Sequence, residues 1–335
     1  PPVRVQDVPA DRLEVVRRCY SSQGIPEKVG QLLLASARGA TRNAYQSAWL
    51  AWSGWCSRRG HNPLRNDIIN ILLFLSESHW EDRAYSSINI YRSMLSSTLD
   101  PIEGHQIGKH PLVVKLMRGI YNTNPPKPRY ERTWDVNSIV RHLGQLKNEE
   151  LEIGALARKL ATLLALAAFL RVSELAAISR EDLVIDGVGM NFSLLRPRKT
   201  QKRGALKSFS IKRLSDHQVD PVAAAERYMQ LTEDLRNSAN EKNLFIGSVR
   251  PHKPVVGSTI ASWIKRQLHE GGVDTQTFSA HSTRGAASSR AAARGVPIQA
   301  ILKAANWSSE STFAKFYRRE LDKEPTPAEI VLSLE

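Results

Sequence analysis

The chain has 335 residues, 41% of them hydrophobic, which is enough to bury a sizeable core and to form two or three domains. Lys and Arg number 47 against 33 Asp and Glu, and the net charge of +14 indicates a polyanionic partner, with nucleic acid as the first candidate and an anionic membrane surface as the rival. The sequence has no run of about 18 apolar residues and no signal-peptide pattern, so we expect no membrane span. The cysteines lack paired spacing, so we expect no disulfide framework and a reducing compartment. There is no His/Cys ligand motif, so we expect no structural metal.

The first third of the chain has the pattern of a small helical bundle. Residues 1 to about 40 resemble a polar leader followed by a helix that opens at Pro26. In the next helix Tyr45, Trp49 and Trp52 recur at i, i+4 and i+7, so these aromatics are expected in the core. The capped or periodic segments that follow predict helices at residues 41–60, 67–76, 84–99 and 112–121.

The helix expected at 84–99 has one face of hydroxyl, amide and arginine side chains. Such a face suits a DNA groove, although a face that is merely solvated has the same composition. The candidate DNA contacts on it and just before it are Arg83, Ser87, Tyr91 and Arg92.

A proline-rich, basic stretch at residues 122–133 separates two parts of the chain. Lys127 and Arg129 within it could contact backbone phosphates, although most proline-rich linkers only connect domains. The expected boundaries are a first domain at 1–124, a linker at 125–131, a second domain at 132–320 and a tail at 321–335.

The second domain mixes helices with one short antiparallel sheet. Strands are expected at 183–185, 190–195 and 208–211, and helices at 136–146, 150–168, 221–235 and 257–269. The loop before the last strand is strongly basic. It could be a solvated hairpin tip, it could contact phosphates, or it could supply a lysine for catalysis. Its candidate residues are Arg198, Lys199, Lys202 and Arg203.

An arginine stands where the apolar helix at 150–168 stops, in the phrase FLRVSEL. Arg171 must find an anion there, and Glu174 alone could satisfy it in a purely structural account.

The stretch from His281 to Tyr317 combines several signals. A helix opening at Ser282 would project His281 and Arg284 from its first turn, where free backbone N–H groups favour an anion. Gly295 fits just past the end of this helix, and Pro297 fits the start of the next. A third helix is expected after Trp307, with Phe313, Phe316 and Tyr317 on one face.

Taken in order, the motifs FLRVSEL, RKT, HSTR, NW and FY resemble those of the tyrosine recombinases, the phage-integrase-like family. The resemblance covers residues 136–319 well and the helical part before them in outline. One departure is that Tyr317 lies ten residues after Trp307, where the family pattern has nine, the position of Phe316. The phrases WSSESTFAKFY and PPKPRYERTWDV look most like recombinases of eukaryotic DIRS-type retrotransposons, with Crypton-type elements a near alternative.

The resemblance implies a fold that is mainly α with a small antiparallel β-sheet in the catalytic domain, and a two-domain, C-shaped DNA clamp. It implies a core-binding (SAM-like) domain at 1–124 and a catalytic domain at 132–320. The implied catalytic residues are Arg171, Lys199, His281, Arg284, Trp307 and the nucleophile Tyr317, with Glu174 orienting Arg171 or His281.

The implied activity is cutting and rejoining of DNA strands through a 3′-phosphotyrosyl bond, without ATP, metal or other cofactor, for integration of a mobile element. The implied partners are double-stranded DNA and further copies of the chain, two per site and four in synapsis. The implied location is the nucleus, or the nucleoid if the source is prokaryotic. The alternatives are a type IB-like topoisomerase and a non-catalytic, basic DNA-binding protein derived from a recombinase.

Overall fold

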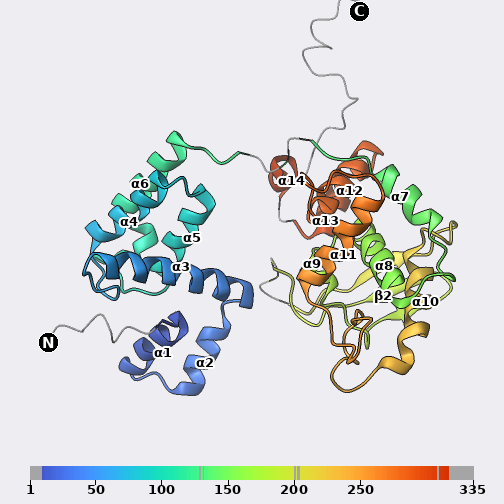
Figure 1. Ribbon diagram of the computed structural model, residues 1–335, viewed down its shortest axis with the longest axis horizontal. Coiled ribbons are helices and arrows are strands. Elements are labelled where there is room, and N and C mark those ends of the chain that lie inside the picture. Colours follow the sequence, from blue (N-terminus) through green and yellow to red (C-terminus); the bar gives the residue numbers. More distant parts are fainter. Residues whose placement is uncertain are drawn as a thin grey trace, which may run out of the picture. The chain divides into compact units, whose positions relative to one another are not determined.

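The computed structural model describes residues 10–127, 130, 132–199, 201, 204–307 and 309–316. The chain divides into two compact units, Pro1–Pro128 and Arg129–Glu335, each with its own hydrophobic core (Figure 1). None of the helices in these ranges is both long enough and apolar enough to cross a bilayer.

The first unit is entirely helical in its described part. Its core is built around Trp52, which is fully buried, stacks on Trp55 with ring centroids 5.5 Å apart and meets the edge of Phe74 at 5.2 Å. The helix that carries both tryptophans is the one expected at 41–60, and Gly60 lies just beyond its end with φ of 68°. The helices are α1 (Arg12–Ser22), α2 (Glu27–Ala35), α3 (Gly39–Arg58), α4 (Ile68–Trp80), α5 (Tyr85–Ser96), the short 3-10 helix η2 (Ile107–Lys109) and α6 (Pro111–Thr123).

Helix α1 lies where the sequence suggested a polar leader. Asp11 is the N-cap of α1, and its carboxylate accepts a hydrogen bond from the Leu13 N–H. Arg12 is buried, and its guanidinium donates to the Thr98 hydroxyl (2.7 Å) and to Ser97. These partners are more than 80 residues away, so the contacts that hold this helix are not visible in its own sequence.

The second unit is mainly helical with a three-stranded antiparallel sheet, as predicted. The sheet order is β1-β2-β3, and Met190 on β2 pairs with Ile185 and Ile211 on its two neighbours. A Cβ on Gly189 would lie 2.2 Å from the Ile211 carbonyl oxygen, so β3 can approach this closely only because the residue is glycine. The elements are α7 (Val136–Gln145), α8 (Ile153–Ala167), α9 (Val172–Leu175), β1 (Val184–Ile185), β2 (Gly189–Phe192), β3 (Phe209–Lys212), α10 (Pro221–Thr232), η3 (Glu233–Leu235), α11 (Gly257–Glu270), α12 (Ser282–Ala293), α13 (Ile298–Ala305) and α14 (Glu310–Phe316).

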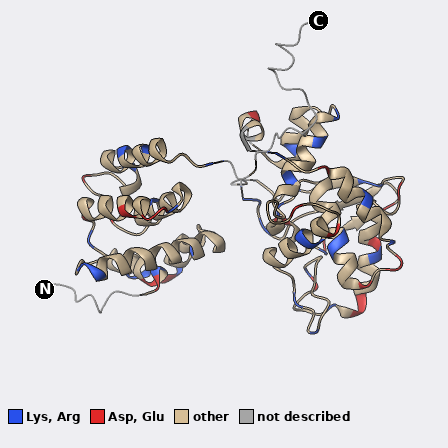
Figure 2. Ribbon diagram, turned by 45° about the horizontal axis from the view of Figure 1, so that its top comes forward, with Lys and Arg blue, Asp and Glu red and all other residues tan. Residues whose placement is uncertain are grey.

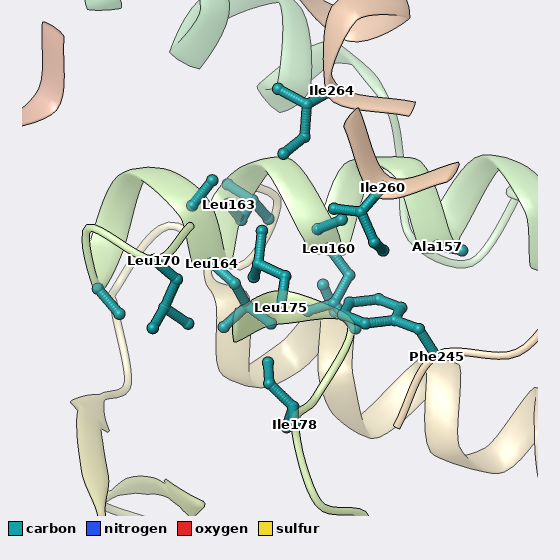
Figure 3. Packing of buried hydrophobic residues seen from close by; sticks show 14 of the residues in the cluster. Ala157, Leu160, Leu163, Leu164, Leu170, Leu175, Ile178, Phe245, Ile260 and Ile264 are labelled. Carbon is teal, nitrogen blue, oxygen red and sulfur yellow. The ribbon is translucent and has the colours of Figure 1, made fainter. Parts of the chain in front are cut away.

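Helix α8 is the centre of this unit and contacts α10, α11 and α12. It is apolar nearly all round, which is typical of a helix surrounded by other elements. Figure 3 shows side chains of α8 packed against those of α9 and α11 and against Phe245. The end of this buried helix is therefore a fixed point from which the following residues project.

The corner between α12 and α13 forms as predicted. Gly295 follows α12 with φ of 82°, a conformation that costs glycine little, and Pro297 is the N-cap of α13. Helix α13 ends at Ala305, and its C-cap Asn306 has the left-handed conformation with φ of 54°. Residues of α12, α13 and α14 share a small core with Phe169, so the last helices are attached to the end of α8.

Candidate active site

The turn after α8 places Arg171 and Glu174 face to face. Phe169 has a positive φ of 50°, and two residues later Arg171 is the N-cap of the four-residue helix α9. The Arg171 backbone N–H donates to Glu174 Oε2 at 2.9 Å, and its guanidinium donates to Oε1 at 2.8 Å. Backbone and side chain of Arg171 are therefore held by one carboxylate.

Arg198 reaches the same carboxylate from the loop after β2. Its Nε and Nη2 donate to the two oxygens of Glu174 at 3.0 and 3.2 Å. It also donates to the carbonyls of Ala304 (3.3 Å) and Ala305 (3.2 Å) at the end of α13, and it lies over the Phe209 ring at 5.1 Å. The residue is only 2% exposed, so its side chain is not presented to solvent as the predicted DNA contact at this position requires.

Arg284 enters the cluster from the first turn of α12. It is 1% exposed, and its Nη2 donates to the Ala305 carbonyl, which also accepts from Arg198. Its Nη1 lies 4.0 Å from Glu174 Oε2, and its guanidinium lies over the Trp307 ring at 4.8 Å. Trp307 is itself buried and stacks on Phe313 at 5.6 Å.

Three guanidinium groups thus surround one carboxylate, and we call these four side chains the arginine cluster: Arg171, Glu174, Arg198 and Arg284. Burial is the largest single influence on the Glu174 carboxyl and raises its pKa, but hydrogen bonds and positive charge from Arg198 and Arg171 outweigh it, so the pKa lies below its ordinary value. Since guanidinium groups stay protonated, the cluster carries two surplus positive charges at neutral pH. Such a surplus in a poorly hydrated place favours a bound anion.

His281 lies beside this cluster in the chain, at the N-cap of α12. It is exposed, whereas Ser282 and Arg284 after it are buried. The Trp134 indole N–H donates to the Ser282 hydroxyl at 2.9 Å and fixes the start of the helix. The N–H groups of this first turn add to the attraction for an anion.

Lys199 directly follows Arg198 and is exposed. A backbone hydrogen bond of 2.8 Å from the Gln201 N–H to the Arg198 carbonyl closes the turn in which it lies. Tyr317, the expected nucleophile, falls outside the described residues, as do Arg129, Lys202 and Arg203.

The candidate DNA contacts of the first unit lie on or near α5. Arg83 is exposed, whereas Ser87 and Arg92 are half-buried. Tyr91 is half-buried and packs on Phe74 at 5.2 Å, so part of its ring belongs to the core. Lys127 is exposed, and Figure 2 shows Lys and Arg on helices of both units. A DNA contact by any of these side chains stays a prediction.

The sequence did not reveal that Arg198 belongs with Glu174. The two-residue period of the buried side chains Phe192 and Leu194 does not extend to Arg198, because Arg196 is exposed. No group of three or more His, Cys, Asp or Glu side chains that could hold a metal occurs in the described ranges.

A sequence model described as "Phage integrase family" matches residues 135–324, more than half of the chain. Among curated proteins, no sequence matches. The similar solved structures include a Tn1549 transposon integrase in complex with transposon right-end DNA (13% identity, TM-score 0.57, 93% of this chain and 96% of that chain).

They also include a XerH site-specific recombinase bound to its difH substrate, with 13% identity and a TM-score of 0.57 over 84% of this chain and 76% of that chain. A third is a lambda integrase dimer bound to a COC′ core site, with 16% identity and a TM-score of 0.51 over 88% of this chain and 94% of that chain. At such identities these structures establish the fold alone. The match over residues 135–324 establishes more, and we conclude that the chain belongs to the phage integrase family, that is, to the tyrosine recombinases.

Proposed function

We propose that this protein is a site-specific DNA recombinase that cuts and rejoins strands of double-stranded DNA through a 3′-phosphotyrosyl intermediate. The observation that carries the proposal is the arginine cluster with its two surplus positive charges, built from residues in the order of the family motifs. A phosphodiester carries one negative charge and gains more on its non-bridging oxygens as a phosphorane forms. The cluster therefore matches the charge of the transition state better than that of the substrate.

In this proposal Arg171 and Arg284 bind the non-bridging oxygens of the scissile phosphate. A guanidinium offers two parallel N–H groups to such oxygens, which a lysine cannot do. Glu174 holds the arginines in place. Trp307 packs against Arg284 and keeps its planar group oriented.

The nucleophile is proposed to be Tyr317, the only tyrosine after Trp307. Its phenolic oxygen attacks phosphorus, and the bond from phosphorus to the 5′ oxygen breaks. The Lys199 ammonium gives its proton to that oxygen, and His281 takes the phenolic proton. A 5′-hydroxyl from a second duplex reverses the step and completes strand exchange, so the reaction needs neither ATP nor a metal.

Covalent capture on labelled DNA tests the nucleophile. Wild-type protein should form a covalent adduct, whereas Tyr317→Phe should bind DNA with unchanged affinity and form none. Tyr121→Phe, at an exposed position of the first unit, is the matched control and should form the adduct. An adduct formed by Tyr317→Phe would show that another residue attacks.

A substrate with a 5′-bridging sulfur tests the general acid, because a thiolate leaves without a proton. Lys199→Ala should lose cleavage of ordinary DNA and regain it on this substrate. Rescue of Lys202→Ala in its place would assign the role to Lys202.

We further propose that the first unit, with Arg83, Ser87, Tyr91 and Arg92, contacts the duplex, and that Lys127, Arg129, Lys202 and Arg203 contact backbone phosphates. Because such contacts release counterions, binding should weaken steeply with salt. A supercoil-relaxation assay run beside a two-site exchange assay separates the recombinase from a type IB-like topoisomerase, which would relax DNA without a second site.

The phrases WSSESTFAKFY and PPKPRYERTWDV support a role in a DIRS-type retrotransposon of a eukaryotic nucleus. We also propose two copies per site and four in synapsis, with the apolar tail after Pro327 passed to a neighbouring copy instead of folding back on its own domain. Deletion of residues 323–335 should then spare single-site binding and reduce two-site assembly in native gel shifts. Equal assembly by the truncated chain would rule out this exchange.

A further inference from the structure

The basic loop between β2 and β3 is tied at both ends to the same short stretch of chain. At its start, Arg198 donates to the carbonyls of Ala304 and Ala305. Near its end, the Lys207 ammonium donates to Asn306 Oδ1 at 2.8 Å. Both tethers converge on the last turn and cap of α13, immediately before Trp307.

Arg198 is the stronger of these two tethers. Its guanidinium is buried, whereas Lys207 is exposed. It binds both oxygens of Glu174 with one edge and two carbonyls with its remaining N–H groups, while its face lies on Phe209 of β3. Only a planar guanidinium with five N–H donors can make all of these hydrogen bonds at once. A lysine ammonium at this position would keep the positive charge but could not make the same set of hydrogen bonds.

The residue after Arg198 is Lys199, whose turn is closed by the hydrogen bond to the Arg198 carbonyl. The side chains of the two residues differ in environment, since that of Arg198 is buried and that of Lys199 is exposed. The backbone of Lys199 is therefore fixed on one side by Arg198. Arg198 is itself held by the Glu174 carboxylate, which also orients Arg171 and Arg284.

We infer that Arg198 is a positioning residue that locks the Lys199 turn to the arginine cluster, so that the proton donor and the phosphate-binding arginines keep a constant separation. This inference rests on the proposed recombinase function. Proton transfer to the leaving oxygen needs a donor within hydrogen-bond reach, and a displacement of about 1 Å costs a large factor in rate. The loss of Arg198 should therefore be felt mainly in the step that uses Lys199.

Arg198→Lys tests this role because it retains the positive charge and removes the fork. Single-turnover cleavage should be measured on ordinary DNA and on DNA with the 5′-bridging sulfur. We expect the variant to be slower than wild type by roughly 10- to 100-fold on ordinary DNA, and within about 3-fold of it on the sulfur substrate. Arg196→Lys, the same change at an exposed position two residues earlier, should leave the ratio of the two rates unchanged.

Equal slowing on both substrates would overturn the inference, since Arg198 would then act through Arg171 and Arg284 alone. Unchanged rates on both substrates would also overturn it. If Arg198→Lys does not fold, Lys207→Met provides the test, because it removes the other contact between this loop and α13 without changing the contacts of Glu174. Slower cleavage of ordinary DNA alone would support the inference, and equal slowing on both substrates would reject it. Failure of wild-type protein to cleave either substrate would instead reject the proposed function.

Discussion

Replacing Glu174 by Gln removes the single negative charge of the arginine cluster and leaves three guanidinium groups around a neutral amide. The Glu174 side chain is only 5% exposed, so water cannot take over its role. Removing one partner of a buried ion pair costs about 3–5 kcal/mol of unfolding free energy. For a unit of about 200 residues, where 1 kcal/mol corresponds to about 2–4 °C, the second unit should melt about 6–20 °C lower.

The matched control is Glu233→Gln. Glu233 has an even shorter contact with an arginine, 2.6 Å from Arg180, but its side chain is 63% exposed. An exposed pair contributes at most about 1 kcal/mol, so the melting temperature should fall by no more than about 4 °C. Both variants can be followed by differential scanning calorimetry at neutral pH. Equal shifts for the two variants would refute the claim that burial of the cluster makes Glu174 important.

The remaining predictions concern pH and the separate cores. Because the pKa of Glu174 is lowered on folding, its contribution to stability is present above about pH 4.5 and should be lost as pH falls through the folded value, and Glu174→Gln should not show that part of the acid transition in melting curves. Burial lowers the pKa of Lys159 to about 8 from 10.5, so Lys159→Met should raise the melting temperature at pH 7. This gain should shrink between pH 8 and 10.5, because the folded wild-type protein has lost the proton there while its unfolded chain still holds it, so wild-type stability rises with pH. A gain independent of pH would contradict this reasoning. Trp52→Ala should destabilise the first unit by about 3–5 kcal/mol, because the side chain is fully buried, and should leave hydrogen exchange in α8 unchanged if the two cores unfold separately.

Sequence reasoning performed well where structure depends on near neighbours. Asp67 caps α4 and Pro297 begins α13, and each of these signals lies within a few residues of the element it defines. The three-stranded sheet was equally accessible, since the turn between its first two strands is fixed by Asp186, whose carboxylate accepts from the Val188 and Gly189 N–H groups.

It failed where a polar side chain is satisfied by a distant partner. The carbonyls that receive Arg198 lie more than 100 residues away, and nothing in RPRKT distinguishes an arginine bound for the interior from one bound for solvent. The burial of Arg12 against Ser97 and Thr98 could not be predicted from the sequence for the same reason. Local patterns report backbone preferences, whereas burial of a guanidinium depends on which carbonyls the tertiary fold leaves available.

The shared carbonyl of Ala305, which accepts from both Arg198 and Arg284, brings two like charges close together in a part of the protein with little water. Their mutual repulsion raises the free energy of the unliganded fold. An anion held by Arg171 and Arg284, as the proposed function requires, would offset this repulsion, and its binding would then stabilise the fold. Inorganic phosphate, sulfate or a DNA end should each protect the second unit against heat and protease, in proportion to how completely it neutralises Arg171 and Arg284.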